Sequence, residues 1–415
     1  MSQAAGTREE AEWLSAATHV LALLRSGWRS LVVRESGQLA ALDGLRALAV
    51  LLVIGDHFSV IVWGGTHLGG WWLRTPFFRY GWSGVDLFFV LSGFLIGGQL
   101  WRERKRSGTV NLPRFFLRRG LRIWPLYFAL LAVMRFGGTS IKPEWPDWAL
   151  VSNYFPTLYA RSWSLSTEEM FYLLVPLFVV CVPRLKARTI ALILVATLVV
   201  VDTSRVLTFH HMMAAAIPSQ EIALRLYSPF HSHNEGLIIG LLLALLVAHA
   251  PQLVAPSLGR RPSRRGLAVL GAALGLAGLD RFLGGQALSF SSLALAYGGA
   301  TYFVLVDRSA LSAVFRWRIW FPVARLSYGM YLNHLILGTG FILAALAAMQ
   351  AWHLGAGTTF ALGLGLTTAI SLMFAGVTFV LVEHPFLHLR NRILAHAPAA
   401  PVAVQATRTV TMQQG

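Results

Sequence analysis

Arg46 and His57 are two ionisable side chains inside one long apolar run, Ala41–Trp63. The run can cross a bilayer, which takes roughly 20 residues. The interval of eleven residues between them is close to three helical turns, so both side chains leave the same helix face, roughly 16 Å apart. Ionisable groups at membrane depth are costly and usually functional. We therefore expect this face to line a polar cavity or an active site; a structural ion pair between Asp43 and Arg46 is the alternative.

The next two apolar runs carry further candidates. Asp86 lies near the start of GVDLFFVLSGFLIGG, where it is either a site residue or a helix cap. Arg119 and Arg122 are three residues apart and share a helix face. Two guanidinium groups at this spacing suit phosphate, because each can make bidentate bonds. The alternative is that these arginines only set the membrane topology.

Two adjacent carboxylates, Glu168 and Glu169, follow Ser164 and Ser166 in the segment SWSLSTEEMFYLLVP. Either serine could cap a helix whose first turn then holds both glutamates, where acidic groups complement the helix dipole. Adjacent residues on a helix face different directions, so one carboxylate could instead face the bundle. Beside a histidine in a dry cavity, such a carboxylate would be an acid–base partner.

Histidines alternate with an acidic residue in FHSHNEGLIIG, which contains His231, His233 and Glu235. Three such side chains could hold zinc. The alternation lacks the second closely spaced ligand pair of a typical metal site, so we expect no metal here. We interpret the segment as a polar rim around a substrate cavity.

The composition identifies the elements that must position these residues. The chain has 415 residues, of which 55% are hydrophobic and 13% are charged, whereas soluble domains carry about 25% charged residues. A polytopic, all-α membrane bundle is therefore predicted. The net charge of +17 resides in short basic connections and does not indicate nucleic-acid binding. The single cysteine, Cys181, excludes a disulfide within the chain.

About ten transmembrane helices are expected. We place them near 41–63, 81–101, 120–136, 164–182, 189–207, 235–250, 266–283, 286–306, 326–349 and 358–382. In the second of these, Ser92, Gly93, Gly97 and Gly98 would let a neighbouring helix approach closely.

Lysine and arginine concentrate in every second connection, which predicts that the even-numbered connections and both termini are cytoplasmic. Residues 1–40 form a predicted cytoplasmic leader; apolar residues at helical spacing indicate an amphipathic helix on the membrane surface, with a disordered leader as the alternative. Residues 41–392 form the transmembrane domain. Residues 393–415 form a predicted disordered tail, rich in Ala, Pro, Thr and Gln.

Six segments in order resemble motifs of the acyltransferase family 3 membrane proteins, over about Leu42 to Arg392. They are LDGLRALAVLLVIGDH, VDLFFVLSGFLI, the pair Arg119 and Arg122 with Pro125 and Tyr127, WSLSTEEMFYLLVP, LSYGMYLNHLIL with Ser327, Tyr328, Tyr331 and His334, and FVLVEHPF with Glu383 and Pro385. No single segment would be specific, whereas six in order are. The chain departs from the family's pattern at His233, where many members have arginine, and at Asn333, where many have tryptophan.

The resemblance implies an enzyme of the bacterial plasma (inner) membrane. It would move an acyl group, often acetyl, from acyl-coenzyme A to a hydroxyl of a sugar, a glycan or a small lipophilic molecule. His57 would be the general base, oriented by Glu168, and Arg46 would bind the donor's carbonyl or phosphate or hold the cavity together. Arg119 and Arg122 would bind the coenzyme A phosphates. Substrate contacts are expected from Asp86, Ser166, Tyr172, His233, Glu235, Tyr331 and His334.

The acyl donor is expected to be acetyl-coenzyme A, with no permanently bound cofactor, and the expected partners are membrane lipids and a carbohydrate or lipid-linked acceptor. The segment after the last span is short for a second domain, so transfer would be completed in the membrane domain or by a partner. The competing function is a transporter or flippase of a lipid-linked or acylated substrate, which would also bury Arg, His and Glu. A third reading, a non-catalytic assembly factor, would tolerate the loss of His57.

Overall fold

The computed structural model describes residue 18 and residues 21–34, 39–66, 70–137, 143–155, 157, 162–182, 185–256, 262–284, 289–334 and 339–396. The described residues are helical and contain no strand, as the composition predicted. The longer helices are α2 (Ala40–Thr66), α4 (Gly84–Ser107), α5 (Leu112–Phe136), α7 (Ser162–Cys181), α8 (Ala187–Ala214), α10 (Glu235–His249), α11 (Arg264–Gly284), α12 (Ser289–Val306), α14 (Trp320–Asn333), α15 (Thr339–Ala351), α16 (Ala356–Thr378) and α17 (His384–His396).

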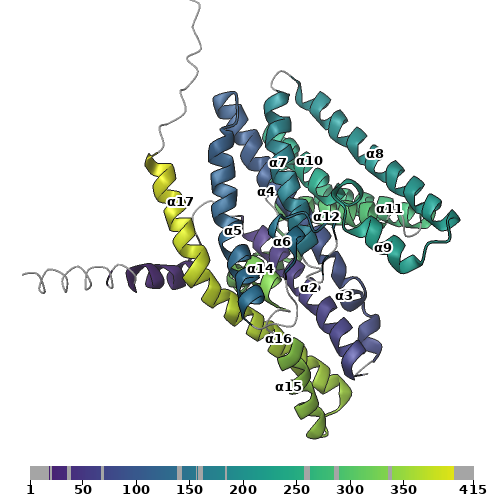
Figure 1. The fold of residues 1–415 in the computed structure, drawn as a ribbon. Coiled ribbons are helices and arrows are strands. Elements are labelled where there is room, and N and C mark those ends of the chain that lie inside the picture. Colours follow the sequence, from purple (N-terminus) through teal and green to yellow (C-terminus); the bar gives the residue numbers. More distant parts are fainter. Residues whose placement is uncertain are drawn as a thin grey trace, which may run out of the picture.

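Short helical elements connect them. They are η1 (Trp71–Arg74), α3 (Pro76–Arg79), η2 (Gly81–Ser83), α6 (Trp145–Trp148), α9 (Ser219–Tyr227), η3 (Phe230–Ser232), η4 (Pro251–Leu253), α13 (Ala310–Ala313), η5 (Val314–Arg316) and a π-helical turn, η6 (Phe379–Glu383). In Figure 1, α2 and α14 lie near the centre of the bundle, whereas α8 and α9 lie at one edge and α15 lies beside the end of α16.

Among the residues that the structure describes, six helical segments are long and apolar enough to cross a membrane. They are Ala40–Val62, Gly81–Ser107, Ser162–Cys181, Ala187–Ala214, Ser289–Val306 and Ala356–Ala395. The protein is therefore a multi-pass membrane protein. The total of ten spans and the side on which each terminus lies stay predictions.

Two predicted spans differ from the observed helices for local reasons. The third begins at Leu112, because the Asn111 side chain accepts a hydrogen bond from the backbone N–H of Arg114 and Pro113 occupies the first turn, where proline is tolerated. The predicted ninth span corresponds to two helices, α14 and α15, which flank residues 335–338; those four lie outside the described residues.

Glycines bring α4 and α10 into close contact, as the small residues of the second run predicted. A Cβ atom on Gly93 would collide with the backbone of Leu237, and one on Gly97 would lie 2.6 Å from the Leu241 side chain. On the facing helix, a Cβ on Gly240 would lie 2.6 Å from the backbone nitrogen of Phe94. This contact joins two of the helices around which the largest buried apolar cluster forms.

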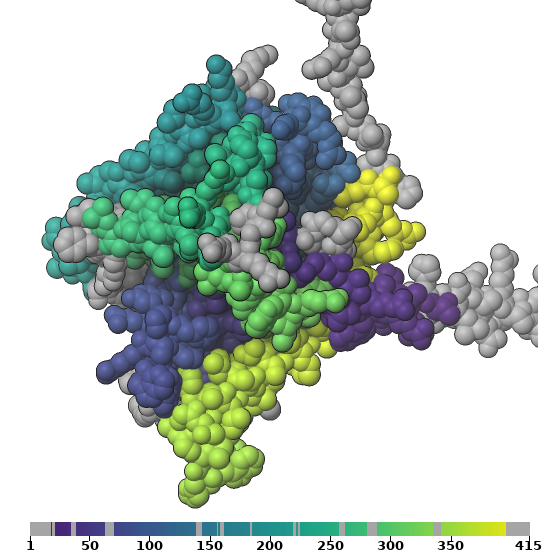
Figure 2. Space-filling model, turned by 180° about the vertical axis from the view of Figure 1, so that it is seen from behind, coloured from purple at the N-terminus to yellow at the C-terminus, as the bar shows by residue number. Residues whose placement is uncertain are grey.

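Part of the predicted leader is helical in the structure, over residues 21–32. Leu31 is buried with Phe379 and Val380, and Gly27 faces His384. Figure 2 shows this segment, in purple, against the yellow C-terminal helix. Its predicted location on the membrane surface stays a prediction, and the tail beyond His396 lies outside the described residues.

Candidate active site

His57 on α2 forms a pair with His334, the residue that follows the last turn of α14. Nδ1 of His57 lies 2.9 Å from Nε2 of His334, and the ring centroids are 5.0 Å apart. His334 is buried, with 3% of its surface exposed. Its Nδ1 lies 2.8 Å from the backbone carbonyl of Tyr331 and 3.1 Å from that of Met330. Two histidines far apart in sequence are thus joined inside the bundle.

These contacts determine the tautomers of the neutral pair. A backbone carbonyl only accepts hydrogen bonds, so Nδ1 of His334 carries its proton and Nε2 carries a lone pair. That lone pair accepts a hydrogen bond from Nδ1 of His57. Because Nδ1 of His57 carries the proton of this hydrogen bond, the lone pair of the neutral His57 ring is on Nε2. A histidine held in this tautomer can take a proton at Nε2.

His57 lines a cavity of about 1060 Å³, which we call the histidine cavity. Asp56, which is adjacent to His57 in sequence, lines it too, together with the aromatic residues Trp82, Trp163, Tyr227 and Phe290. Tyr227 belongs to α9, and burial together with the neighbouring Asp86 raises its pKa well above the usual value for tyrosine. Its phenol therefore stays protonated and neutral.

Five arginines line a second cavity, of about 510 Å³, which we call the arginine cavity: Arg46, Arg102, Arg118, Arg119 and Arg122. The only acidic side chain among its lining residues is Glu168. Arg119 donates a hydrogen bond of 2.7 Å to Gln99 and lies over the Tyr172 ring at 5.8 Å. The excess of positive charge suits a ligand with several phosphate groups.

Arg46 and Arg122 make no hydrogen bond or ion pair with any residue that the structure describes, although both guanidinium groups lie inside the bundle. The alternative, a direct ion pair between Asp43 and Arg46, is not formed: Asp43 pairs with Arg34 at 2.8 Å and lines a cavity with Arg46. Arg46 and Arg122 both line this third cavity, of about 600 Å³, together with Arg102, Arg325 and the acidic residues Asp43 and Glu383. The two like charges face open space that an anion could occupy.

The arginine cavity and the histidine cavity meet at Tyr331 and Val85, which line both. The Tyr331 hydroxyl is hydrogen-bonded to the hydroxyl of Ser164 on α7. The Tyr331 ring packs edge-on against Phe88 of α4. Tyr331 therefore lies between the arginines and His57 as part of the wall of both cavities.

Glu168 does not orient His57 as predicted. It lines the arginine cavity, where its carboxylate accepts hydrogen bonds from Ser92 at 2.7 Å and from Tyr172 at 2.9 Å. The helix α7 begins at Ser162, so neither Glu168 nor Glu169 lies in its first turn. The helix-dipole explanation for the two glutamates is therefore wrong. His334 occupies the orienting position that the carboxylate was expected to fill.

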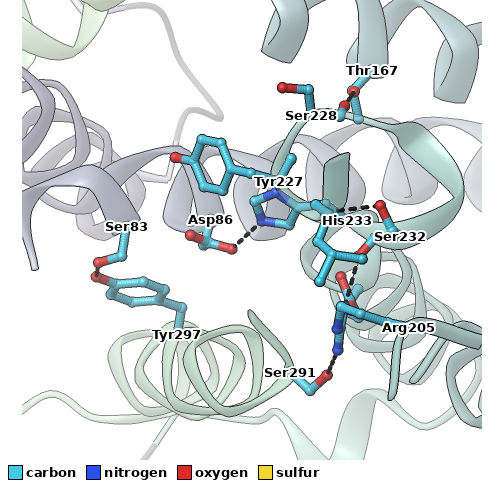
Figure 3. Close-up of polar contacts among 12 residues, drawn as sticks. Ser83, Asp86, Thr167, Arg205, Tyr227, Ser228, Ser232, His233, Ser291 and Tyr297 are labelled. Carbon is cyan, nitrogen blue, oxygen red and sulfur yellow. Dashed lines mark hydrogen bonds and ion pairs between the residues drawn. The ribbon is translucent and has the colours of Figure 1, made fainter. Parts of the chain in front are cut away.

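His233 and Asp86 form a buried pair outside the two cavities (Figure 3). Nε2 of His233 lies 2.8 Å from Asp86, and Nδ1 lies 2.7 Å from the backbone carbonyl of Tyr227. The His233 ring stacks between Phe290 at 4.1 Å and Trp163 at 5.5 Å, both of which line the histidine cavity. His233 therefore supports the cavity wall from behind and is fully buried.

Glu235 is buried in an ion pair with Arg205 of α8. Arg205 also donates hydrogen bonds to Ser291 and to the backbone carbonyl of Ser232 (Figure 3). His231 contacts Tyr154 instead. Among the described residues, no three His, Cys, Asp or Glu side chains are grouped as metal ligands would be. Apart from exposed His231, the predicted polar rim is thus a buried network behind the aromatic wall of Trp82, Trp163, Tyr227 and Phe290.

The remaining predicted residues divide between the cavity surface and the interior. Tyr172 and Tyr331 line the arginine cavity. Ser166 is buried, and its hydroxyl oxygen lies 3.0 Å from that of Ser152. Ser164, two residues earlier, lines the arginine cavity instead of Ser166.

The sequence reading missed a second group of lining residues. It consists of Asp56, Ser92, Gln99, Arg102, Arg118 and the aromatic wall. Ser92 and Gln99 are seven residues apart on α4, and this helical spacing of polar residues in an apolar run was the available signal. The aromatic wall comes from four separate segments and left no such signal.

Comparisons with known proteins agree with the architecture. A family model described as an acyltransferase domain (Acyl_transf_3) matches residues 39–376. Peptidoglycan O-acetyltransferase OatA of Listeria monocytogenes is 31% identical over 163 residues, which are 33% of this chain and 24% of that protein. O-acetyltransferase OatA of Staphylococcus aureus is 33% identical over 175 residues, 37% of this chain and 26% of that protein. The matches span about a quarter of these relatives' length. No solved structure gives a significant match.

Proposed function

This chain belongs to the acyltransferase 3 family, and we propose that it is a membrane O-acyltransferase that moves an acetyl or other short acyl group from acyl-coenzyme A to an alcohol. The observation that carries the proposal is the junction at Tyr331, where a cavity with five arginines meets a cavity with an oriented histidine pair. The first suits a phosphorylated donor and the second suits a hydroxyl that must lose its proton.

The donor occupies the arginine cavity in this proposal. Arg46 and Arg122 bind its phosphates, and their lack of described protein partners leaves their donor groups for the ligand. Arg119, held by Gln99, adds a third guanidinium. The thioester end extends past the Ser164–Tyr331 contact toward His57.

The transfer step uses the tautomer of His57. Nε2 of His57 takes the proton of the acceptor hydroxyl as the oxygen attacks the thioester carbonyl. The carbon–sulfur bond then breaks, and the leaving thiolate takes the proton from Nε2. The imidazolium that forms between these events keeps its Nδ1–H on His334, so the ring does not reorient during the reaction. General-base catalysis of this kind contributes roughly 10²–10⁴-fold in rate.

The test uses purified protein in lipid nanodiscs with acetyl-coenzyme A and a mixed panel of alcohols. We expect acceptors to gain one acetyl mass while free coenzyme A forms in equal amount. The variant His57→Ala should abolish both signals, and Arg122→Lys should raise the donor KM because lysine lacks the bidentate fork. Arg135→Lys is the matched control, since Arg135 is exposed on the same helix and lines none of the three cavities.

The same assay distinguishes the proposed enzyme from the competing function, a transporter. A transporter moves its substrate without changing its mass and consumes no thioester. Absence of acetyl transfer to every alcohol, in protein that folds and binds acetyl-coenzyme A, would contradict the proposed enzyme.

A further inference from the structure

The histidine cavity differs in character from one end to the other. His57, Asp56 and Arg79 supply charged or titratable groups at the end formed by α2 and the short elements after it. Phe209 and Met213 of α8, with Ile222 and Leu226 of α9, form an end without charge. Figure 1 shows α2 near the centre of the bundle and α8 and α9 at its edge. The cavity therefore runs from a polar catalytic end to an apolar end near the periphery.

An apolar cluster continues the second end into the protein. Ile222 and Leu226 of α9 line the cavity and are buried with Met212, against Phe209. Met213 is 54% exposed. None of these side chains offers a hydrogen-bond donor or a strong acceptor.

The wall between the two ends is aromatic and preformed. Trp82 packs edge-on against both Tyr227 and Phe290. His233 is held at both ring nitrogens, and its ring stacks against Phe290 and against Trp163. The cavity does not need to collapse around a ligand to become ordered, which lowers the entropic cost of binding.

This lining discriminates between classes of acceptor. A glycan with hydroxyls on all sides would leave several of them without partners against the apolar end, and each unpaired buried polar group is unfavourable. A molecule with one polar head and an apolar body would match both ends. The cavity volume of about 1060 Å³ is large enough for both parts.

We propose that the acceptor is an amphiphilic alcohol whose hydroxyl-bearing head lies at Asp56 and His57 and whose apolar body lies among Phe209, Met213, Ile222 and Leu226. This inference rests on the proposed function. Asp56 is the head-binding residue: its carboxylate accepts a hydrogen bond from the backbone N–H of Trp82 and lies on the cavity surface. It can accept a further bond from an acceptor hydroxyl next to the one that reacts.

The test compares acceptors that share one head. Wild-type protein in nanodiscs, with saturating acetyl-coenzyme A, is assayed with methyl, hexyl and octyl β-glucoside and with a soluble chito-oligosaccharide. We expect kcat/KM to rise with chain length, by up to about fourfold for each methylene that becomes buried. The methyl glucoside and the oligosaccharide should be the poorest acceptors.

Longer glucosides also accumulate in the bilayer, which could by itself raise kcat/KM. Two variants of α8 therefore distinguish binding in the cavity from partitioning into the bilayer. Met213→Gln places an amide at the apolar end and should reduce the octyl-to-methyl ratio of kcat/KM about four- to fifteenfold, the effect of withdrawing one or two methylenes. Leu207→Gln is the matched control, because Leu207 is 65% exposed on the same helix and does not line the cavity. Asp56→Asn should raise the KM of every glucoside alike, without changing the ratio.

Three results would overturn the inference. The oligosaccharide could be acetylated as well as octyl glucoside, or the two α8 variants could change the ratio equally; either result leaves the proposed enzyme intact. If the wild type acetylates none of the four acceptors and forms no free coenzyme A with the wider alcohol panel, both proposals fail.

Discussion

At the residue scale, the orientation of His57 depends on a second histidine and on a helix end. The backbone carbonyls of Met330 and Tyr331 accept from Nδ1 of His334 because His334 lies at the end of α14, where its side chain can turn back to the last carbonyls. His334 then plays the part for His57 that a carboxylate plays in a catalytic triad. A neutral histidine in this place adds no charge, so the pair does not bury an uncompensated carboxylate.

Replacing His334 with alanine should lower kcat at least about 10-fold, bounded by the roughly 10²–10⁴-fold that the base supplies. The donor KM should change little, because His334 does not line the arginine cavity. The acidic limb of the pH–rate profile should also shift, since His57 loses the acceptor that holds its tautomer. Steady-state kinetics from pH 5 to 9 would measure both effects.

Two further variants make this prediction specific. His334→Gln should recover part of kcat, because the glutamine oxygen can accept from Nδ1 of His57. His231→Ala is the control, as His231 contacts Tyr154 away from the pair. An unchanged kcat and pH profile in His334→Ala would remove His334 from the mechanism.

At the element scale, close helix contacts hold the cavity walls at fixed distances. Helix α4 contributes Ser92, Gln99 and Arg102 to the arginine cavity, and its other side packs against α10 through paired glycines. The connection after α12 is held differently, by one carboxylate. Asp307 accepts hydrogen bonds from the backbone N–H of Ser263 at 2.7 Å and from both the N–H and the hydroxyl of Ser309.

Gly240→Ala should destabilise the protein by about 1–3 kcal/mol, because the new methyl group overpacks the contact with α4. Gly275→Ala on α11 is the control, since a Cβ there meets nothing within 4 Å and alanine is the better helix former. Thermal unfolding in detergent measures both. A Tm that falls equally in the two variants would show that the contact between α4 and α10 can accommodate a methyl group at Gly240.

Asp307→Asn should cost about 1–3 kcal/mol of folding free energy, because donors at Ser263 and Ser309 lose an acceptor. Burial alone would raise the pKa of Asp307, but the hydrogen bonds from Ser309, Ser312 and Ser263 outweigh it and lower the pKa below its usual value. A lowered pKa means that the carboxylate stabilises the fold above its unfolded pKa of about 3.9 and loses this effect as pH falls through the folded value.

The wild-type Tm should therefore fall more steeply below about pH 4 than that of Asp307→Asn. Glu221→Gln provides the comparison, because the Glu221–Arg225 pair is exposed and should contribute little. Parallel Tm curves for wild type and Asp307→Asn across that range would contradict the assignment.

At the scale of the whole molecule, six helical segments of the described residues are long and apolar enough to cross the bilayer, and the other helices are shorter or more polar. Helix α10 has only 15 residues and is mostly buried between its neighbours. Helix α5 carries arginines that a lipid-facing helix could not hold, and it turns three of them toward the arginine cavity.

The native cysteine offers a direct test of the predicted orientation. Cys181 is exposed at the C-terminal end of α7, which we predict to be cytoplasmic. A membrane-impermeant maleimide should label it in inside-out vesicles and not in right-side-out vesicles. In a Cys181→Ser background, Glu144→Cys should show the opposite pattern. Labelling of both positions from the same side would contradict the alternating topology.

Helix positions, the membrane class and the family were readable from the chain because they depend on local patterns. An apolar run of bilayer length becomes a helix whichever neighbours it meets, since only internal hydrogen bonds can satisfy its backbone in lipid. The grouping of Arg46 with His57, of Arg119 with Arg122 and of the small residues of α4 could also be predicted from the sequence, because the spacing within each group corresponds to one helix face. Residues 41–63 of the prediction and Ala40–Thr66 of the structure accordingly differ by only one to three residues at each end.

Only the tertiary structure decided which side chains pair across different helices. The sequence by itself could offer Glu168, Asp43 and His334 as neighbours of a buried histidine or arginine, but nothing local ranks them. In the folded protein, His57 pairs with His334, Asp43 with Arg34 and His233 with Asp86. The physical reason is that rotation and depth of each helix follow from packing against all its neighbours at once, as at the glycine contact of α4 with α10. The aromatic wall of the histidine cavity, assembled from four segments, could arise only from that packing.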